Sequence, residues 1–408
     1  MNPFHLNPQP IDHFLRNWNA LLPAPYDKQT VDPYTRARVI LMNGTEFEQV
    51  WFSHSFSRHC ADNDLRREIA LLRRAEQQQQ KYVSCLKPAD ETILEHTIGY
   101  EQLAVDLTAA LARLVPCPDA RAALDFALLE DFDHLYRYAN LMDMETGVAA
   151  ERLTGGYTEI MPGRPTVREH RHPFDSIRRF TDDATAALMT KLAANIITAA
   201  EQQTMNYYMN AATLYPTDAG RQLYQEIGMI EEQHVTHYGS LLDPRPTWLE
   251  SLLMHQYTEC YLYYSCMESE SDARIRGVWS RLFEEEVSHL HHAARLLKDY
   301  EGTDWQEIIP GGEFPQLLVL ESNIDYVRRI LASQIDLTAV REEYVPVGLL
   351  PENADYFRYQ AIVNAGPVPS EEVISRYAAR YGTDYRCETD PHPIASLQSR
   401  RVMPAGRK

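Results

Sequence analysis

Apolar residues recur at the 3.6-residue spacing of amphipathic helices along most of the chain from residue 58 to residue 300. Prolines and the DPRPT stretch at 243–247 interrupt this pattern at intervals, as expected between helices. The pattern therefore predicts an all-α core with seven long helices, placed at residues 60–85, 88–114, 118–145, 182–214, 218–242, 248–270 and 272–300.

The two ends of the chain lack this sustained period. Residues 1–57 are rich in proline, asparagine and aromatic residues and predict an irregular N-terminal arm. Residues 301–408 predict a C-terminal extension with one or two helices, after a helical core at 58–300. Within that core, residues 145–180 cannot form one helix, and their length suits a connection that runs the whole length of a helical bundle.

The composition argues against several classes of binding partner and metal site. The formal net charge of −19 disfavours general binding to nucleic acid or to anionic membranes. No apolar run approaches the roughly 20 residues that span a bilayer, and the first residues lack the pattern of a signal peptide. The six cysteines form no CxxC pair, which excludes a rubredoxin-type or zinc-ribbon site. We expect a cytoplasmic protein with no nucleic-acid or membrane partner.

Pairs of an acid and a histidine three residues apart carry the candidate chemistry. Chance alone would give roughly two such pairs in a chain of this composition. Glu169/His172 lies in the proline-rich connection and is interpreted as a chance match. The other three pairs fall within the apolar stripes of their helices: Asp131/His134, Glu231/His234 and Glu286/His289. An unpaired buried carboxylate costs several kcal/mol, so each should be neutralised, paired or bound to a cation.

A further glutamate precedes each pair on the preceding helix. Glu101 and Glu201 lie thirty residues before Asp131 and Glu231, and Glu259 lies 27 residues before Glu286. In an antiparallel helical hairpin these separations bring the lone glutamate level with the acid-x-x-His pair. We call such a set, one glutamate and one pair on a hairpin, a half-site. Two half-sites suit two hard or borderline divalent cations, which carboxylates bridge and histidines terminate.

The residues around these positions have simpler interpretations. Glu130 and Asp133 are expected on the exposed face, although Glu130 could replace Asp131 as the acid paired with His134. The glutamine run after Glu76 is expected to be an exposed helical face. Most tyrosines are expected to pack in the core, with two placed to contact the ligands, Tyr138 and Tyr238. Solvated faces are expected for three histidines: His237, His291 and His292.

The hairpins resemble those of a known superfamily. The segment AEQQTMNYYMNAATLYP, followed by YQEIGMIEEQHVTHYGSLL, is similar to a rubrerythrin-type hairpin of the ferritin-like di-iron carboxylate proteins, and ECYLYYSCMES with RLFEEEVSHLHHAARLL is similar to a second. The resemblance covers residues 88–300 and implies a ferritin-like four-helix bundle with a long crossover, extended by an additional hairpin. Two features depart from it. Asp131 stands where the family has glutamate, and there are three half-sites where one bundle uses two.

Two pairings of the half-sites are open. The long connection favours joining the first and second hairpins, which gives a primary site of Glu101, Asp131, His134, Glu201, Glu231 and His234. The competing pairing joins the second and third hairpins. The remaining half-site, which consists of Glu259, Glu286 and His289, is an alternative or second site. A second subunit could complete it across a two-fold axis, and we therefore expect a homodimer.

The resemblance implies two bound iron ions, or manganese, and an O₂- or peroxide-dependent oxidase, oxygenase or peroxidase acting on an unknown small molecule. No catalytic residue beyond the metal ligands stands out, and without a rubredoxin module the electrons would come from a separate donor. Two alternatives remain open at this stage. One is iron binding or storage without turnover, and the other is a structural helical protein with buried acid–His networks.

Overall fold

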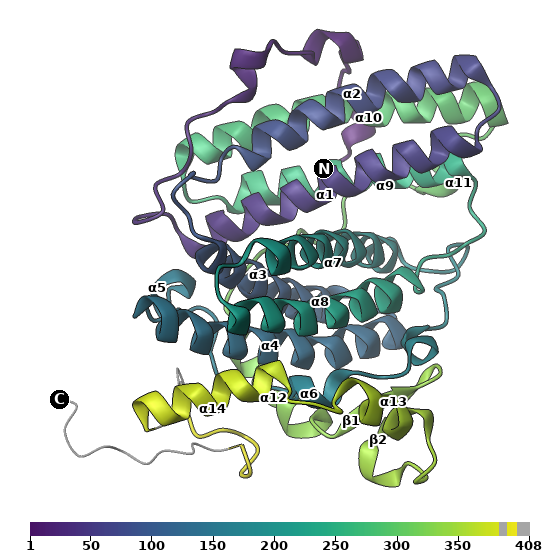
Figure 1. Cartoon of the computed structure of the whole chain (residues 1–408). Coiled ribbons are helices and arrows are strands. Elements are labelled where there is room, and N and C mark those ends of the chain that lie inside the picture. The colour runs from purple at the N-terminus through teal and green to yellow at the C-terminus, as the bar shows by residue number, and fades with distance from the viewer. Residues whose placement is uncertain (383–389, 398–408) are drawn as a thin grey trace. The chain divides into compact units, whose positions relative to one another are not determined.

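The computed structural model describes residues 1–382 and 390–397 (Figure 1). The all-α class predicted from the sequence is confirmed, because α-helices α1 to α14 account for most of the described chain. The one sheet within these residues is a small antiparallel hairpin of β1 (Leu337–Val340) and β2 (Glu343–Pro346), in which Leu337 lies opposite Pro346. None of the helices described is both long enough and apolar enough to cross a bilayer.

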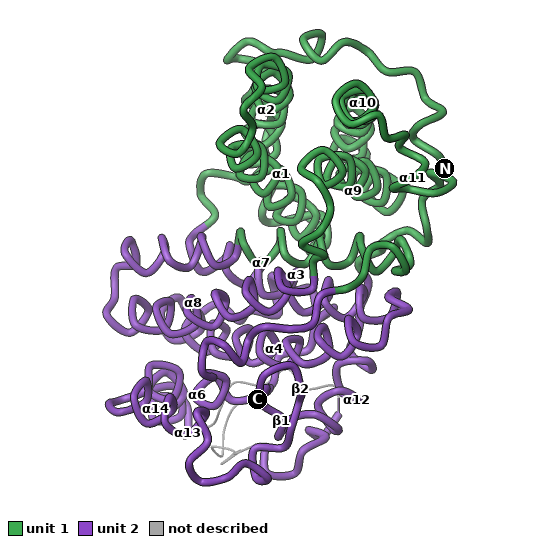
Figure 2. Tube along the Cα trace, turned by 90° about the vertical axis from the view of Figure 1, so that its right-hand side faces the viewer, with its two compact units in different colours: residues 1–91, 181–203, 242–320 green, residues 92–180, 204–241, 321–408 purple. Residues whose placement is uncertain are grey.

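The chain forms two compact units, each built from three separate segments (Figure 2). Unit 1 comprises residues 1–91, 181–203 and 242–320. Unit 2 comprises residues 92–180, 204–241 and 321–408. This division differs from the predicted arm, core and extension, because helices of the expected core are shared between the units.

Unit 1 contains two long helical hairpins. One consists of α1 (Pro33–His59) and α2 (Asn63–Ser84), and the other of α9 (Trp248–Ser269) and α10 (Ala273–Glu301). Helix α1 contacts α9, and α2 contacts α10, so the four helices form a bundle. Shorter elements complete the unit: η1 (Pro3–His5), η2 (Ile11–Phe14), η3 (Trp18–Leu21) and α11 (Trp305–Ile308).

The prediction of an irregular arm over residues 1–57 is wrong for its second half, which is α1. Asp32 accepts a hydrogen bond from the Tyr34 N–H and caps the helix, and Pro33 occupies its first position. The helix buries polar residues as well as apolar ones, among them Thr35, Arg36, Arg38, Glu46 and Gln49. Hydropathy therefore shows no clear stripe along α1, although most of its surface is buried.

Unit 2 is built around α3 (Ile93–Leu114), α4 (Pro118–Thr146) and α8 (Asp218–Gly239). Helices α3 and α4 form a hairpin, and α4 also contacts α8. Helix α7 (Leu188–Leu214) is continuous, and the boundary between the two units falls inside it, after Gln203. These helices agree closely with the predicted ones, and signals in the sequence mark several of their ends: Thr92 caps α3, and α4 begins at Pro118 and ends before Gly147.

The long connection of unit 2 packs against α4. It contains α5 (Glu151–Thr154), α6 (Thr166–Glu169) and η4 (Pro173–Ser176). The Gly163 N–H donates to Asp133 Oδ1 at 3.0 Å, and the Thr166 N–H and hydroxyl donate to Asp133 Oδ2 at 2.9 and 2.7 Å. Gly163 lies so close to α4 that a Cβ there would be 2.5 Å from the Leu129 carbonyl oxygen. The connection is thus fixed to α4 at Gly163 and at Thr166.

The C-terminal extension has more structure than the one or two helices expected. Beyond α11 it contains α12 (Ile324–Gln334), η5 (Val347–Leu349), α13 (Asp355–Val363) and α14 (Pro369–Tyr381), and part of its tail lies outside the described residues. Helix α13 holds the backbone of the connection: side chains of Tyr356, Gln360 and Asn364 donate to carbonyl oxygens of residues 167–170. Helix α14 contacts α4 and α8.

Substitution of Gly163 by alanine should destabilise the protein by about 1–3 kcal/mol, because the new Cβ must push the connection away from α4. Gly277 provides the control, since it is exposed on α10 and a Cβ there meets nothing within 4 Å. Gly277→Ala should stabilise by up to about 1 kcal/mol through helix propensity. Chemical denaturation measures both values, and equal effects at the two positions would contradict the close approach seen at Gly163.

Candidate metal centre

The first and second hairpins bring their acids and histidines together in unit 2. Helix α3 carries Glu101, α4 carries Asp131 and His134, and α8 carries Glu231 and His234. None of these side chains is more than 1% exposed. Ligand atoms of Asp131, Glu231 and His234 lie within 4.8 Å of one another, and so do those of Glu101, His134 and Glu231. We call these five residues the unit 2 cluster.

Both histidines have one ring nitrogen fixed by an outer carboxylate. His134 Nε2 lies 2.9 Å from Glu169 Oε2, and His234 Nε2 lies 2.8 Å from Glu130 Oε2. The opposite nitrogens face the cluster. His134 Nδ1 is 3.1 Å from Glu231 Oε1, and His234 Nδ1 is 3.1 Å from Asp131 Oδ1.

This arrangement has a direct electrostatic consequence. When a histidine donates its Nε2 proton to a carboxylate, a neutral ring presents the Nδ1 lone pair to the cluster. Two acceptors then face each other at Nδ1 and the nearby carboxylate oxygen, which is repulsive unless a second proton or a cation lies between them. Histidines that ligate metals are typically held in this way by a carboxylate on the other nitrogen.

Among the described residues no lysine or arginine pairs with the cluster acids, but the two histidines do. Burial would raise the pKa of Glu231, but hydrogen bonds from His134 and His234 hold it below its usual range. Neither oxygen of Asp131 accepts a hydrogen bond from the described residues, and one oxygen of Glu101 and one of Glu231 are in the same condition. The Tyr208 hydroxyl donates to the other oxygen of Glu101 at 2.5 Å. Burial raises the pKa of Glu101 well above its usual range, and the nearby Glu231 and Asp131 carboxylates raise it further. Burial likewise raises the pKa of Asp131.

The outer acids, by contrast, are neutralised by arginines. Arg171 and Arg164 contact Glu130 Oε1 at 2.8 and 3.2 Å, and Arg137 Nε contacts Asp133 Oδ2 at 2.9 Å. Burial alone would raise the pKa of Glu130, but Arg171, the hydrogen bond from His234 and Arg164 together hold it well below its usual range.

Several sequence-based placements around the cluster are wrong. Glu130 and Asp133 were expected to be exposed, and both are fully buried because arginines from the connection and from α4 cover them. His237 was expected on a solvated face. It is also fully buried, and its Nε2 donates to the Ala123 carbonyl at 3.2 Å. The polar residues flanking the candidate ligands thus form a second buried layer.

Glu169 is the functional residue that sequence reasoning missed. It was dismissed as half of a chance acid-x-x-His match, yet its carboxylate holds His134 and is only 2% exposed. Burial raises the pKa of Glu169 to about 8. Its sequence motif carried no useful signal, because Glu169 contacts His134 on another element and makes no use of His172.

The tyrosine that hydrogen-bonds to a cluster acid is not one of the two expected to contact the ligands. Tyr138 and Tyr238 are fully buried next to the cluster, where Tyr138 packs against the rings of Tyr208 and Tyr224, and Tyr238 lies beside His234. Tyr208, which was expected only to fill the core, is the one that contacts a cluster carboxylate through a described hydrogen bond.

Glu201 belongs by residue number to unit 1, although it lies on the continuous helix α7. It is buried, and it precedes Tyr208 by seven residues, or about two helical turns. Residues seven apart share one face of a helix, so Glu201 lies on the same face of α7 as the tyrosine that donates to Glu101. Its role as a ligand stays a prediction.

The third hairpin, whose half-site had no assigned partner in the sequence analysis, belongs to unit 1. Glu259, Glu286 and His289 are buried there together with Glu46 of α1 and Glu76 of α2. The homodimer was expected because this half-site lacked a second one. In unit 1, Glu46 and Glu76 of the same chain lie beside it. The glutamine run after Glu76 was expected to be exposed, but Gln79 is fully buried against Glu286, which corrects that expectation.

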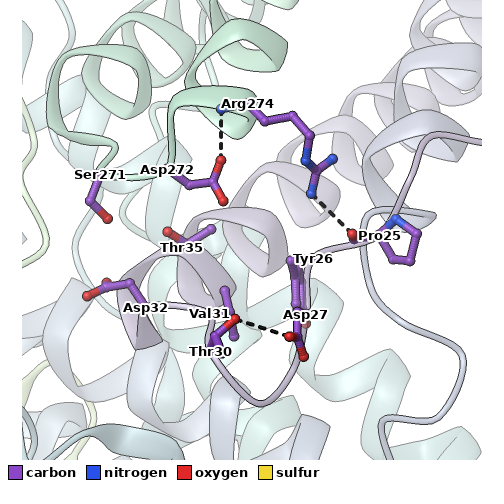
Figure 3. Close-up of a pocket in the computed structure, with 10 residues that line it drawn as sticks. All are labelled: Pro25, Tyr26, Asp27, Thr30, Val31, Asp32, Thr35, Ser271, Asp272 and Arg274. Atoms are coloured by element: carbon purple, nitrogen blue, oxygen red, sulfur yellow. Dashed lines mark hydrogen bonds between the residues drawn. The ribbon is translucent and has the colours of Figure 1, made fainter.

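Unit 1 also has a surface pocket, lined by residues between 25 and 35 and between 271 and 274 (Figure 3). Its hydrogen bonds have structural roles. Asp272 accepts from the Arg274 N–H and caps α10, and the Arg274 guanidinium donates to the Pro25 carbonyl at 3.1 Å. The lining contains none of the candidate metal ligands.

Comparison of the chain with protein-family models, with curated proteins and with solved structures found no match. The interpretation of the unit 2 cluster therefore depends on its own geometry.

Replacing Arg171 by glutamine should destabilise the protein by about 3 kcal/mol, because it removes one of the two cations that compensate the buried Glu130. The matched control is Arg179→Gln. Arg179 pairs with Glu343 at 3.0 Å, but both side chains are 69% exposed, so the loss should stay below about 1 kcal/mol. Urea denaturation compares the two variants, and similar losses would contradict the special role of the buried pair.

Proposed function

We propose that unit 2 is a ferritin-like bundle that binds two divalent metal ions, iron or alternatively manganese, and that it acts as an O₂- or peroxide-dependent oxidoreductase. The observation that carries this proposal is the orientation of the two histidines. Each places Nε2 against an outer carboxylate and turns Nδ1 towards cluster acids that pair with no lysine or arginine among the described residues.

The donor set fits such a pair of ions. Glu101, Asp131 and Glu231 supply three carboxylates, and Glu201 on α7 is proposed as the fourth. Four carboxylates and two neutral imidazoles balance the charge of two divalent ions. Carboxylate-rich sites with few histidines suit iron or manganese, and the half-site pattern on helices is that of di-iron and di-manganese carboxylate proteins.

The protein residues around the ligands have definable roles. Glu169 and Glu130 orient His134 and His234 through their Nε2 atoms. Arg164 and Arg171 keep Glu130 ionised, so that it can accept the His234 proton. The Tyr208 hydroxyl orients Glu101. Asp133 anchors the connection that carries Glu169.

Burial limits which reactants can reach the cluster. The five cluster side chains are at most 1% exposed, so a species that reaches them in this conformation must be small. When bound, a pair of iron ions would supply the activation of O₂ or peroxide. Electrons would come from a separate donor, and the oxidised substrate stays an unknown small molecule.

Metal analysis tests the binding step. After anaerobic loading with Fe²⁺ or Mn²⁺, the His134→Ala/His234→Ala variant should contain roughly two ions per chain fewer than the wild-type protein. His172→Ala is the control, because His172 follows Glu169 in the connection but is not part of the cluster. It should keep the wild-type metal content. If elemental mass spectrometry finds the wild-type metal content in the double variant, the proposal is wrong.

A second test asks whether substitution of a cluster acid raises or lowers the melting temperature of the metal-free protein. Asp131 accepts no hydrogen bond from the described residues, so Asp131→Asn removes a repelling charge and loses no such bond. A stabilisation of about 1 kcal/mol should raise the melting temperature of the metal-free protein by roughly 1–2 °C for a chain of this length. Asp133→Asn should lower it instead, because Asp133 pairs with Arg137 and accepts several hydrogen bonds.

A fall in melting temperature for Asp131→Asn, equal to that for Asp133→Asn, would favour a structural network of acids and histidines. Turnover then separates an enzyme from a metal-binding protein. Iron-loaded wild-type protein should consume hydrogen peroxide repeatedly in the presence of a reductant, and the double histidine variant should not. Uptake limited to a single stoichiometric round would instead favour iron binding without turnover.

A further inference from the structure

A second cluster of buried acids lies within unit 1, on its four long helices. Glu46 is on α1, Glu76 on α2, Glu259 on α9, and Glu286 and His289 on α10. None of these side chains is more than 1% exposed. We call these five residues the unit 1 cluster.

The geometry of this cluster centres on Glu76. Ligand atoms of Glu46, Glu76 and Glu259 lie within 4.8 Å of one another, and so do those of Glu76, Glu286 and His289. His289 Nδ1 lies 3.0 Å from Glu76 Oε1 and 3.1 Å from Glu286 Oε1. One acid is thus shared between two groups of ligands, as a bridging carboxylate would be.

The chain leaves the negative charge of this cluster largely uncompensated. Each of the four carboxylates has one oxygen that accepts no hydrogen bond from the described part of the chain. Within that part, Glu76 and Glu286 pair with His289, and none of the cluster acids pairs with a lysine or arginine.

Amide side chains satisfy only some of the oxygens. The Gln79 amide donates to Glu286 Oε1 at 2.7 Å. The Gln256 amide donates to Glu76 Oε1 at 3.0 Å and to Glu259 Oε2 at 2.8 Å. The Tyr263 hydroxyl donates to Glu46, as Tyr208 does to Glu101 in unit 2. These donors orient the carboxylates without supplying a positive charge.

The spacing on α1 and α2 repeats that of the other hairpins. Glu76 follows Glu46 by thirty residues, the same separation as between Glu101 and Asp131. Gln79 stands three residues after Glu76, where His134 stands after Asp131. The first hairpin of unit 1 is therefore a half-site in which glutamine replaces histidine.

We propose that the unit 1 cluster is a second site for two divalent metal ions, formed by Glu46, Glu76, Glu259, Glu286 and His289 within one chain. Four carboxylates balance the charge of two such ions. With one imidazole in place of two, the donor set is harder than that of unit 2 and suits Mn²⁺ better than softer ions. The site does not depend on the proposed function of unit 2.

Equilibrium dialysis with Mn²⁺ tests this site in a chain whose unit 2 cluster is disabled. The His134→Ala/His234→Ala variant should still bind Mn²⁺, and adding Glu76→Gln/Glu286→Gln should abolish that binding. Glu284→Gln is the control, because Glu284 is exposed on the same helix two residues before Glu286. It should leave binding unchanged. Absence of Mn²⁺ binding to the first variant, or unchanged binding after the added substitutions, would overturn the proposal.

The reciprocal experiment keeps the two proposals separate. Glu76→Gln/Glu286→Gln alone should lower the metal content of the full chain while the ions assigned to unit 2 remain. Metal loss from this variant but not from the unit 2 variant would leave only the unit 1 site standing, and the reverse would leave only unit 2. In addition, Glu259→Gln should raise the melting temperature of the metal-free protein, and a fall would identify a structural network and overturn the metal site.

Discussion

A carboxylate buried among helices must be compensated, and this chain compensates its buried acids in two ways. Glu130 and Asp133 are paired with arginines of the same chain, which belong to α4 and to the long connection. The acids one layer further in, such as Asp131 and Glu76, have no such pairing among the described residues. Since an uncompensated buried charge costs several kcal/mol, the inner acids are the positions at which we propose bound metal ions.

The sequence predicted the helices well because their ends carry explicit signals, such as the Thr92 and Thr247 capping boxes and the glycine after α4. It also predicted that Glu101, Asp131 and Glu231 are buried, although not that Glu130 and Asp133 are. It failed where burial depends on tertiary partners. Helix α1 buries Arg36, Arg38 and Glu46 along with its apolar residues, so its periodicity is hidden. Glu169 reaches His134 from an irregular segment, and no local pattern encodes that contact.

Glu76 belongs to no acid-x-x-His pair, because the residue three positions later is Gln79. The motif therefore does not identify it as a candidate ligand. Histidine offers a lone pair to a cation, whereas the glutamine amide here donates a hydrogen bond to Glu286. The two clusters are therefore built on similar helical hairpins, but the unit 1 cluster has Glu76 and Gln79 where the unit 2 cluster has Asp131 and His134. This difference would make them unequal in affinity for a given ion, even in the same solution.

The order of the segments along the chain has a consequence for biosynthesis. Helices α1 and α2 leave the ribosome first, yet the helices that cover Glu46 and Glu76 begin only at Trp248. The α1–α2 hairpin must therefore remain without its partners while more than 150 further residues are made. Contacts so distant in sequence form slowly, and an exposed apolar hairpin favours misassociation in the meantime. The charged side chains that α1 and α2 later bury would keep this nascent hairpin hydrated until its partner helices arrive.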